Sequence, residues 1–477
     1  MSGGIYTTDF AKTLQSLADV EIDNIQNNQG PVYNSSTEVF ENKYIPASST
    51  ALTGVEGDVP VEDGAGGLKS SAVIHVDTTN NRVGINNGTP TQDLDIDGNV
   101  LIDNNGFLQI NDKLNIKTDV VDNTINIGFD TGTSSTGNQC INIGPQAGNN
   151  LQNNSCIAIG QYCAGLGQGS NAITMGFLSG WAFQGSDAIA VGNNAGNTNQ
   201  GIGAIAIGKE SGKTAQATNS IAIGVTAGET SQGQSSIAIG DTAASSSQGV
   251  ECVAVGSECG STSQGDYAVA VGKQAAESDQ GSEAVAIGRL SGQTDQGSSS
   301  VAIGYNSGNS SQGQSSVAVG SNAANQGQGQ NCVAIGETAA NIGQGNNSVA
   351  IGYQSGRLVQ GNHAIAIGNT AGEGSQSQDA IAIGRLAAQT NQGNNAIAIG
   401  YISGASNQGT NSIAIGGSAG NISQAPQSIV INATGVALQN TTTSSLVIKP
   451  VRGVAHGIGV GVMYYDPTSG EITYSTT

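Results

Sequence analysis

Short apolar tetrads, Ile-Ala-Ile-Gly or a close variant, return along most of this chain with one fixed spacing. The closing glycine stands at Gly128, Gly144 and Gly160 and continues at the same sixteen-residue interval to Gly416, nineteen times without insertion or deletion. A twentieth unit closes at Asn432. Stacked β-strands require such a register, because one inserted residue would turn the next strand's core face outward. The pattern therefore predicts an all-β fold, a parallel β-solenoid of about twenty coils over residues 125–432.

Each tetrad reads as a short strand followed by a turn. In Ile157-Ala158-Ile159-Gly160 the side chains alternate, so we expect both isoleucines to face the core and Ala158 to face away from it. Gly160 permits the sharp turn that ends the strand. Alanine recurs at the middle position of most units, which predicts a continuous outward stripe of small apolar residues. Such a stripe predicts an interface, and a closed cyclic oligomer covers it most simply.

A second column of identical residues follows the glycine by eight positions. It is glutamine from Gln152 to Gln424, unbroken through eighteen units, and glycine usually comes next. We interpret the Gln-Gly pair as the second corner of the coil, where stacked glutamines form an amide ladder. One coil then holds two strands and two turns. Twenty coils at roughly 4.8 Å each would build a rod about 95 Å long.

The repeat resembles a known family. The units Asn219–Gly224, Ser316–Gly320 and Asn411–Gly416 resemble the head repeats of YadA-like trimeric autotransporter adhesins. The resemblance implies a left-handed parallel β-roll in which three chains pack about one axis. The sixteen-residue period departs from the shorter one of the family's heads, which affects the turns rather than the coil.

The flanks point to a different setting. Residues 81–100 are similar to a segment common in tail fibres of phages and large DNA viruses, and residues 463–474 to the C-termini of virion fibre proteins from giant algal viruses and cyanophages. Residues 1–6 show no secretory signal, and the C-terminus shows no run of membrane-barrel strands. We therefore expect a homotrimeric virion fibre, made in the host cytoplasm, displayed on the virion surface and joined at one end to a capsid or tail component. The alternative is a bacterial YadA-like adhesin head on the cell surface.

The rest of the chain divides into three further parts. Residues 1–69 are predicted to be an N-terminal attachment and linker segment, and residues 70–124 a small β-domain that leads into the roll. Residues 433–477 are predicted to form a β cap, because solenoids need atypical ends that stop edge-to-edge growth.

Local signals refine these flanks. Apolar spacing over Thr8–Ile25 predicts one amphipathic helix. The stretch Gln26–Gly67 is rich in Pro, Ser, Gly and Asp and is typical of an extended linker. Alternation at Val73–Val76 and Leu94–Asp97 predicts strands, and Asp466–Gly470 predicts the turn of a terminal hairpin.

Composition narrows the range of partners. The chain carries 14 Lys and Arg against 35 Asp and Glu, a formal net charge of −21. Phosphate backbones and anionic membrane surfaces both attract basic proteins, so neither nucleic acid nor a membrane surface is an expected partner. No run of 18 apolar residues exists, so no membrane-spanning segment is predicted. The acidic surface is expected to keep a long β-protein soluble.

The six cysteines follow the repeat. Four share one position and two share another, each where other units carry Ser, Ala or Asn: Cys140, Cys156, Cys252 and Cys332, then Cys163 and Cys259. We interpret them as small space-filling residues rather than disulfide partners or metal ligands.

Motifs that carry chemistry are weak. The run from Asp93 to Gly98 imitates the start of an EF-hand loop, but its twelfth position is Asn104 where the loop needs Glu, and no metal site is predicted. Gly-rich stretches lack the lysine of a phosphate loop, and no pair of acids or nucleophile and base recurs in the repeat. His363 stands in a polar column beside Asp379, which indicates a surface position. We expect no catalytic residue and no cofactor, and therefore not an enzyme.

Aromatic residues are the better lead to a binding surface. Phe177, Tyr305, Tyr353 and Tyr401 each follow a repeat glycine, and two more aromatic residues belong to the unit of Phe177: Trp181 and Phe183. Exposed rings on a stiff rod could stack on the sugars of a host-surface glycan or anchor a receptor. The alternative is that this position tolerates any side chain, since cations also occupy it: Lys273, Arg289 and Arg385.

Two other solenoid functions are less well supported. Ice binding needs a flat ladder of regularly spaced threonines, and Thr214, Thr230 and Thr294 recur irregularly. A polysaccharide-degrading solenoid needs acids grouped in a groove, and the repeat places its acids singly.

Overall fold

The computed structural model divides the chain into two compact units, Met1–Ile116 and Lys117–Thr477. The residues that it describes are 29–34, 39–44, 58–62, 68–77, 82–85, 94–96, 124–132, 137–451, 462–466, 468–470 and 472–475. Within these ranges, no helix has the length and apolar character needed to cross a bilayer.

The first unit contains a six-stranded sheet in the order β2-β1-β3-β4-β5-β6. Its strands are β1 (Gln29–Asn34), β2 (Val39–Tyr44), β3 (Asp58–Glu62), β4 (Leu68–Asp77), β5 (Arg82–Ile85) and β6 (Leu94–Ile96). The strands that alternation predicts around residues 73–76 and 94–97 are confirmed by β4 and β6.

The extended linker expected over Gln26–Gly67 is wrong for the strand residues within it. β1 and β2 pair antiparallel from Gln29 with Tyr44 to Asn34 with Val39, and β1 also pairs with β3. Composition misled here, because a turn-rich stretch still forms strands when short apolar runs find a partner strand. The predicted helix Thr8–Ile25 lies outside the described residues, and the four-part division of the chain stays a prediction.

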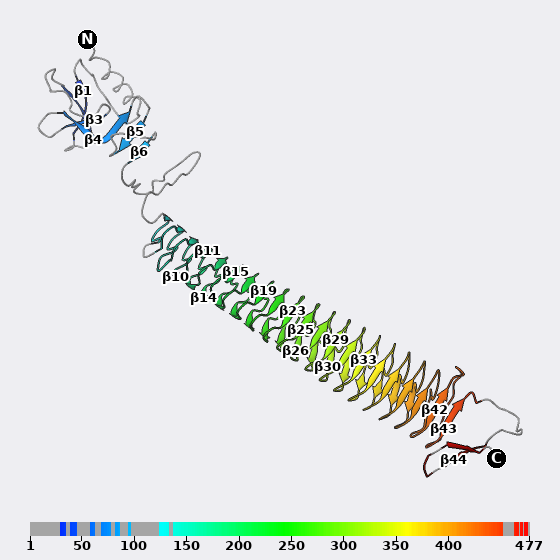
Figure 1. Ribbon diagram of the computed structural model, residues 1–477. Coiled ribbons are helices and arrows are strands. Elements are labelled where there is room, and N and C mark those ends of the chain that lie inside the picture. The colour runs from blue at the N-terminus through cyan, green and yellow to red at the C-terminus, as the bar shows by residue number, and fades with distance from the viewer. Residues whose placement is uncertain are drawn as a thin grey trace. The chain divides into compact units, whose positions relative to one another are not determined.

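The second unit is dominated by a stack of coils, so the predicted parallel β-solenoid is confirmed. Figure 1 shows the coils following one another in sequence order from cyan to orange. Each coil gives one strand to a first parallel sheet, in which Ile205 pairs with Ile221 and Ala206 with Ala222. Because the offset between paired residues is constant from β7 to β42, identical positions of successive units stack directly on one another.

We call this first sheet the isoleucine sheet. Its strands are β7 (Ile125–Ile127), β8 (Ile141–Ile143), β9 (Ile157–Ile159), β11 (Ile173–Met175), β13 (Ile189–Val191), β15 (Ile205–Ile207), β17 (Ile221–Ile223), β19 (Ile237–Ile239), β21 (Val253–Val255), β23 (Val269–Val271), β25 (Val285–Ile287), β27 (Val301–Ile303), β29 (Val317–Val319), β31 (Val333–Ile335), β33 (Val349–Ile351), β35 (Ile365–Ile367), β37 (Ile381–Ile383), β39 (Ile397–Ile399), β41 (Ile413–Ile415), β42 (Ile429–Asn432) and β43 (Leu446–Lys449).

A second parallel sheet, the glutamine sheet, takes one strand ending in glutamine from each of sixteen coils. Its strands are β10 (Leu166–Gln168), β12 (Ala182–Gln184), β14 (Thr198–Gln200), β16 (Thr214–Gln216), β18 (Thr230–Gln232), β20 (Ser246–Gln248), β22 (Thr262–Gln264), β24 (Ser278–Gln280), β26 (Thr294–Gln296), β28 (Ser310–Gln312), β30 (Gln326–Gln328), β32 (Ile342–Gln344), β34 (Val359–Gln360), β36 (Ser375–Gln376), β38 (Thr390–Gln392) and β40 (Ser406–Gln408).

The orientation predicted for the Ile-Ala-Ile strands is reversed in the structure. The middle residues Ala206 and Ala302 are fully buried, whereas Ile207 and Ile303 keep 39% and 38% of their surface exposed. The interior leaves little room beside this position in most coils: a Cβ added to the turn residue Gly308 would lie 3.1 Å from the Cβ of Ala302. Larger residues take the same buried position in only a few coils, as Thr174 and Val430 do. The outward stripe therefore consists of isoleucine and valine, and the alanines form the core.

The amide ladder is confirmed, but it lies inside the roll rather than at a corner. Gln296 Nε2 donates to Gln312 Oε1 at 3.2 Å, and the same amide donates to the carbonyl of Val285 in the isoleucine sheet at 2.9 Å. These buried glutamines thus connect successive coils and also tie the two sheets together. The ladder is interrupted where an Oε1 atom accepts no hydrogen bond, at Gln184, Gln232, Gln248 and Gln360.

The repeat glycine is required at the corner after each isoleucine-sheet strand. Gly272 has a φ of +130°, and a Cβ there would lie 2.7 Å from the carbonyl oxygen of Gly288 in the next coil. The corner therefore excludes side chains for two reasons, an unfavourable backbone conformation and direct contact with the stacked backbone. The turn after the glutamine instead places Asn, Asp or Ser at positive φ in most coils, as at Asn219 and Asn331.

All six cysteines are free and buried, as small core residues. The Cys252 thiol donates to Gly265 O at 2.9 Å, the same type of bond that the Ser236 hydroxyl makes to Gly249 O at 2.6 Å one coil earlier. Burial raises the pKa of Cys163 to about 11 and that of Cys259 to about 12. These two thiols therefore stay protonated at neutral pH.

The C-terminal end of the roll departs from the repeat. β43 pairs in parallel with β42, Ile429 opposite Leu446, so the offset here is one residue longer than between the preceding coils. A hairpin follows, formed by β44 (Val462–Tyr465) and β45 (Ile472–Ser475) in antiparallel register. Its predicted turn is confirmed, because Gly470 N–H donates to Asp466 O at 2.8 Å.

Candidate functional site

The aromatic residues that follow the repeat glycine all lie on the surface. Phe177, Tyr305, Tyr353 and Tyr401 are exposed by 41%, 44%, 44% and 46%. The three tyrosines recur every third coil, so roughly 14 Å separates one from the next at about 4.8 Å per coil. The structure therefore spreads these rings along one corner of the roll and does not gather them into a single site.

Two of the tyrosines are paired with an arginine from the preceding coil. The Arg289 guanidinium carbon lies 4.7 Å from the centre of the Tyr305 ring, and that of Arg385 lies 4.4 Å from the Tyr401 ring. A cation over an exposed ring contributes about 0.5–1 kcal/mol, so these pairs stabilise neighbouring corners. Tyr353, at the same position, stands between coils that carry Glu337 and Asn369 there. Exposure of this column is consistent with ligand contact and with simple tolerance of any side chain.

The aromatic residues near the start of the roll are arranged differently. Phe177 meets Tyr162 edge-on, with 6.2 Å between ring centres. Trp181 is 38% exposed and starts the path toward the glutamine sheet, where Phe183 is 65% exposed. The sequence does not predict Leu151 and Leu166 as contact residues, although both are exposed in columns that mostly carry small or polar side chains.

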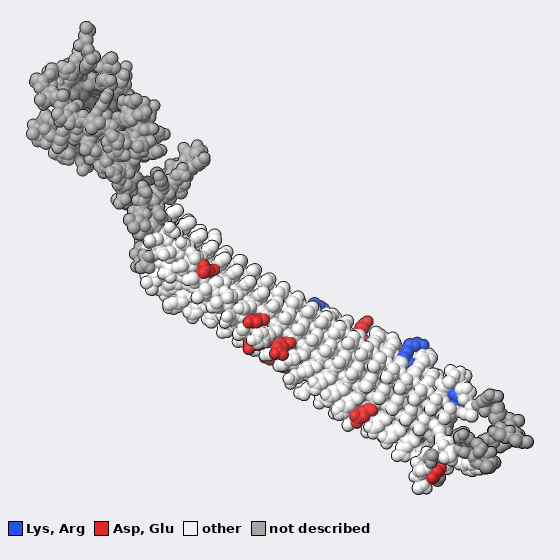
Figure 2. Space-filling view, in the orientation of Figure 1, with Lys and Arg blue, Asp and Glu red and all other residues white. Residues whose placement is uncertain are grey.

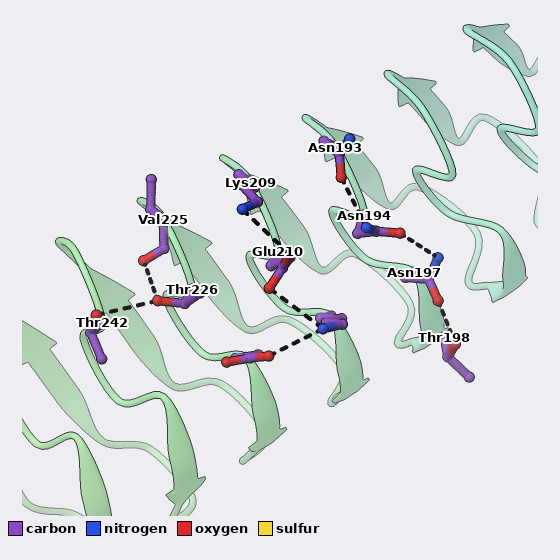
Figure 3. A network of polar contacts seen from close by, with 11 residues as sticks. Asn193, Asn194, Asn197, Thr198, Lys209, Glu210, Val225, Thr226 and Thr242 are labelled. Carbon is purple, nitrogen blue, oxygen red and sulfur yellow. Dashed lines mark hydrogen bonds and ion pairs between the residues drawn. The ribbon is translucent and has the colours of Figure 1, made fainter.

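Polar side chains form ion pairs and hydrogen bonds at the same corner, both within coils and between them. Glu210 lies between two lysines, with nitrogen–oxygen distances of 3.7 Å to Lys209 and 3.5 Å to Lys213. Figure 3 shows the pair with Lys209. Lys213 also contacts Glu229 of the next coil at 3.3 Å, and this hydrogen bond holds the pKa of Lys213 above its ordinary value. Farther along, the hydroxyls of Thr226 and Thr242 lie 3.3 Å apart. Exposed pairs of this kind add little stability individually.

Charge is sparse over the roll as a whole. On the face drawn in Figure 2, acidic and basic side chains stand singly or in small groups on an otherwise uncharged surface. His363 lies on the surface as predicted, with Nδ1 3.1 Å from Asp379 Oδ1. Among the described residues, no group of three or more His, Cys, Asp or Glu side chains is placed to hold a metal ion.

The largest continuous feature is the outer face of the isoleucine sheet, which we call the isoleucine face. It consists of the first and third residues of the three-residue strands, isoleucine or valine in nearly every coil. These side chains stay half-buried or exposed, for example Ile239 at 37% and Ile335 at 39%. Monomeric soluble proteins rarely expose apolar patches larger than a few hundred Å², and this one runs the full length of the roll.

Comparison with known families gives one match. The YadA head domain repeat matches two copies, at residues 344–355 and 392–419. Both segments lie within the roll and contain an isoleucine-sheet strand, β33 and β39 among them. Searches of the curated proteins and of the solved structures found no match. The roll is thus a repeat solenoid that contains two segments similar to the YadA head domain repeat.

Proposed function

We propose that this chain is the rigid shaft of a homotrimeric fibre that projects from a surface and supports attachment. The observation that carries this proposal is the isoleucine face, an unbroken apolar surface on one side of every coil. A closed assembly of three rolls would remove these side chains from water, which is favourable by about 25 cal/mol for each Å² of apolar surface covered. The match to a YadA head repeat, a repeat of trimeric adhesin heads, supports the same arrangement.

The three-residue strands explain why one face serves this purpose. Because Ala302 fills the interior, the flanking Val301 and Ile303 have no place within their own chain and stay partly exposed. β-Branched side chains on a pleated surface pack well against a similar surface. The interior and the proposed interface are therefore two consequences of one strand pattern.

We place the fibre on a virion, attached at one end to a capsid or tail component and facing a host-surface glycan or receptor. The support for this setting is the similarity of residues 81–100 and 463–474 to viral fibre segments. The second candidate is a bacterial surface adhesin head, which the match at 344–355 and 392–419 favours. In both settings the role is structural, without catalysis or a cofactor. Antibodies against the roll that label purified particles would support the first, and labelling of a bacterial envelope the second.

The mass of the folded protein tests the assembly directly. Multi-angle light scattering is expected to give three times the 47.4 kDa of one chain. The double substitution Ile287→Lys with Ile335→Lys places two charges on the isoleucine face and is expected to shift the mass to that of one chain. The matched control Ser311→Lys places the charge on the exposed side of the glutamine sheet and is expected to leave the trimer intact.

Two results would count against the trimer. One is a monodisperse 47.4 kDa species for the unmodified protein. The other is a trimer that persists in the double lysine variant, because the interface would then lie elsewhere. Far-ultraviolet circular dichroism on the same samples separates loss of assembly from loss of the fold.

A further inference from the structure

The first coils of the roll differ from the others in charge and in surface. Between Asp130 and Asp187 the sequence contains no Asp, Glu, Lys or Arg, although the whole chain carries 14 basic and 35 acidic residues. The same stretch exposes large apolar side chains on the glutamine sheet and its edge. Leu151 is 66% exposed, Leu166 37% and Phe183 65%.

Two adjacent coils fit together there because large residues of one coil lie against small residues of the other. Gly165-Leu166-Gly167 in one coil lies beside Trp181-Ala182-Phe183 in the next, with Leu166 and Ala182 in register. A Cβ on Gly165 would lie 2.8 Å from both Cδ1 and Nε1 of Trp181, and one on Gly167 would lie 3.8 Å from Cδ1 of Phe183. Both aromatic side chains therefore lie over the glycines of the preceding coil.

These glycines hold the rings against the roll while leaving them open to solvent. Ala182, between the two aromatic residues, is only 2% exposed, yet Trp181 and Phe183 keep 38% and 65% of their surface. We call Trp181, Phe183, Leu166 and Leu151 the aromatic platform. Amide side chains border it on the coils before and after, Asn150 and Asn199 in the same columns as Leu166 and Phe183.

The platform faces away from the proposed trimer interface. Gln168 Nε2 reaches across the interior to the carbonyl of Ile157 at 3.2 Å, so the two sheets face each other and their outer surfaces point apart. A partner chain on the isoleucine face would therefore leave the platform uncovered. The exposure of the two rings excludes a role for them as core residues. Contact with Gly165 and Gly167 gives each ring a defined position.

We propose that the aromatic platform binds a neutral saccharide. Indole and phenyl rings that lie against a rigid sheet stack on the apolar face of a sugar ring, and neighbouring amides hydrogen-bond its hydroxyl groups. The lack of charge over this stretch favours a neutral sugar over an anionic one or a charged protein surface, which would need complementary charges. Saccharide binding extends the proposed attachment role. It rests on that role only in placing the sugar on the surface to which the fibre attaches.

The single tryptophan of the chain makes the platform directly observable, because Trp181 is the only one. Cellohexaose, maltohexaose and penta-N-acetylchitopentaose serve as neutral probes, with sialyllactose and a heparin hexasaccharide as anionic ones, each titrated into the full-length protein. We expect a saturable change in tryptophan fluorescence with at least one neutral probe and none with the anionic probes.

Variants then assign the response to the platform. Phe183→Ala keeps the reporter and is expected to weaken the binding of the responding probe at least tenfold. Tyr353→Ala removes an exposed aromatic residue far along the roll and is expected to leave affinity unchanged. No response to any neutral probe at millimolar concentration would overturn the proposal, and so would binding by anionic probes alone or undiminished binding by Phe183→Ala. Light scattering on the same samples distinguishes this failure from failure of the fibre proposal, since a silent platform in a sample with the mass of three chains overturns only the saccharide site.

Discussion

The two sheets of the roll are both parallel β-sheets, but they bury and expose opposite kinds of side chain. In the isoleucine sheet the interior position is alanine and the outward positions are isoleucine or valine, with rare exceptions such as Met175. In the glutamine sheet the buried position is glutamine, and the outward positions vary from Thr198 to Phe183 and Asp279. The apolar residues with the largest side chains therefore lie outside, and the largest buried side chains are polar.

This difference separates the positions that stabilise a coil within its own chain from the positions that can contact another molecule. Successive units in one chain give an internal comparison, in which a position that varies freely meets only solvent. The glutamine sheet varies outside and is constant inside, as a solvent-facing sheet should be. The isoleucine sheet varies little on either side, as the trimer interface proposed for its outer face would require. Core stability then comes from close contact between small residues and from buried amide hydrogen bonds.

Replacing a repeat glycine would break the corner that both sheets share, and we expect the largest effect there. Gly272→Val introduces a side chain at a φ of +130° and against the carbonyl of Gly288. The free energy of unfolding should fall by at least about 3 kcal/mol, because strain and overpacking add. Denaturant titration followed by circular dichroism measures it.

The matched control for this corner is the next residue, which lies outside the stacked backbone. Lys273→Val carries the same side chain and should change the unfolding free energy by less than about 0.5 kcal/mol, as surface substitutions usually do. Equal effects of the two substitutions would mean that the corner tolerates side chains and that coil spacing is not set by the glycines.

Substitutions within one strand test whether the isoleucine sheet has two different faces. Ala302→Leu overfills the narrow interior and should lower the unfolding free energy by about 1–3 kcal/mol at any protein concentration. Ile303→Ser instead removes an outward side chain and weakens the proposed trimer, so the melting temperature of this variant should depend more steeply on protein concentration than that of the unmodified protein. Thermal melts over a hundredfold range of concentration distinguish them. Concentration-independent destabilisation by Ile303→Ser would count against a contact of Ile303 with a second chain.

The sequence was sufficient to predict the coil but not which face of the strand is buried. The fixed spacing gave the register, the two strands of each coil and the glutamine ladder. Alternation in Ile157-Ala158-Ile159 shows that isoleucine and alanine face opposite ways, yet it is symmetric with respect to inside and outside. The width of the interior decides between them, and this width depends on the opposite sheet and on turn residues such as Gly308.

The candidate sites show a similar limit. Aromatic residues after the repeat glycine were predicted as exposed, and their position in the unit was enough for that. The stacking of Arg289 on Tyr305 and the placement of Trp181 over Gly165 depend on contacts between units. Arg289 and Tyr305 stand sixteen residues apart, as do Gly165 and Trp181, so an alignment of consecutive units places each pair in one column.

The glutamine ladder offers a graded test of its own, because some of its links are missing. Gln296→Met removes the link from Gln280 at 3.1 Å and the link to Gln312, in addition to the bond to Val285. Gln232→Met removes only bonds to the carbonyls of Ile221 and Ser236, since Gln232 Oε1 accepts none.

Buried groups that lose a partner cost about 1–3 kcal/mol. Gln296→Met should therefore destabilise the roll by about 1 kcal/mol more than Gln232→Met, measured by denaturant titration of both variants side by side. An equal loss would show that the amide-to-amide bonds contribute nothing beyond the bonds to the backbone.

The smallest effect is expected where the interior already accepts two chemistries. Cys252→Ser should change the unfolding free energy by less than about 1 kcal/mol at neutral pH. The reason is that Ser236 makes the equivalent bond one coil earlier. Denaturant titration of the variant beside the unmodified protein measures the change, and a larger loss would mean that the sulfur fills space that a hydroxyl leaves empty.

Unlike a serine hydroxyl, the thiol of Cys163 can lose its proton in alkaline solution. Burial raises the pKa of Cys163 from 9.0 to about 11, so the folded state holds its proton where the unfolded state loses it. Stability from this source is complete below about pH 9 and declines as the pH rises toward 11. Folded protein at mildly alkaline pH should accordingly react slowly with a thiol-specific disulfide reagent and release the full signal of its six thiols on unfolding. Rapid reaction of the folded protein would show that the cysteines lie on the surface and not in the core of the roll.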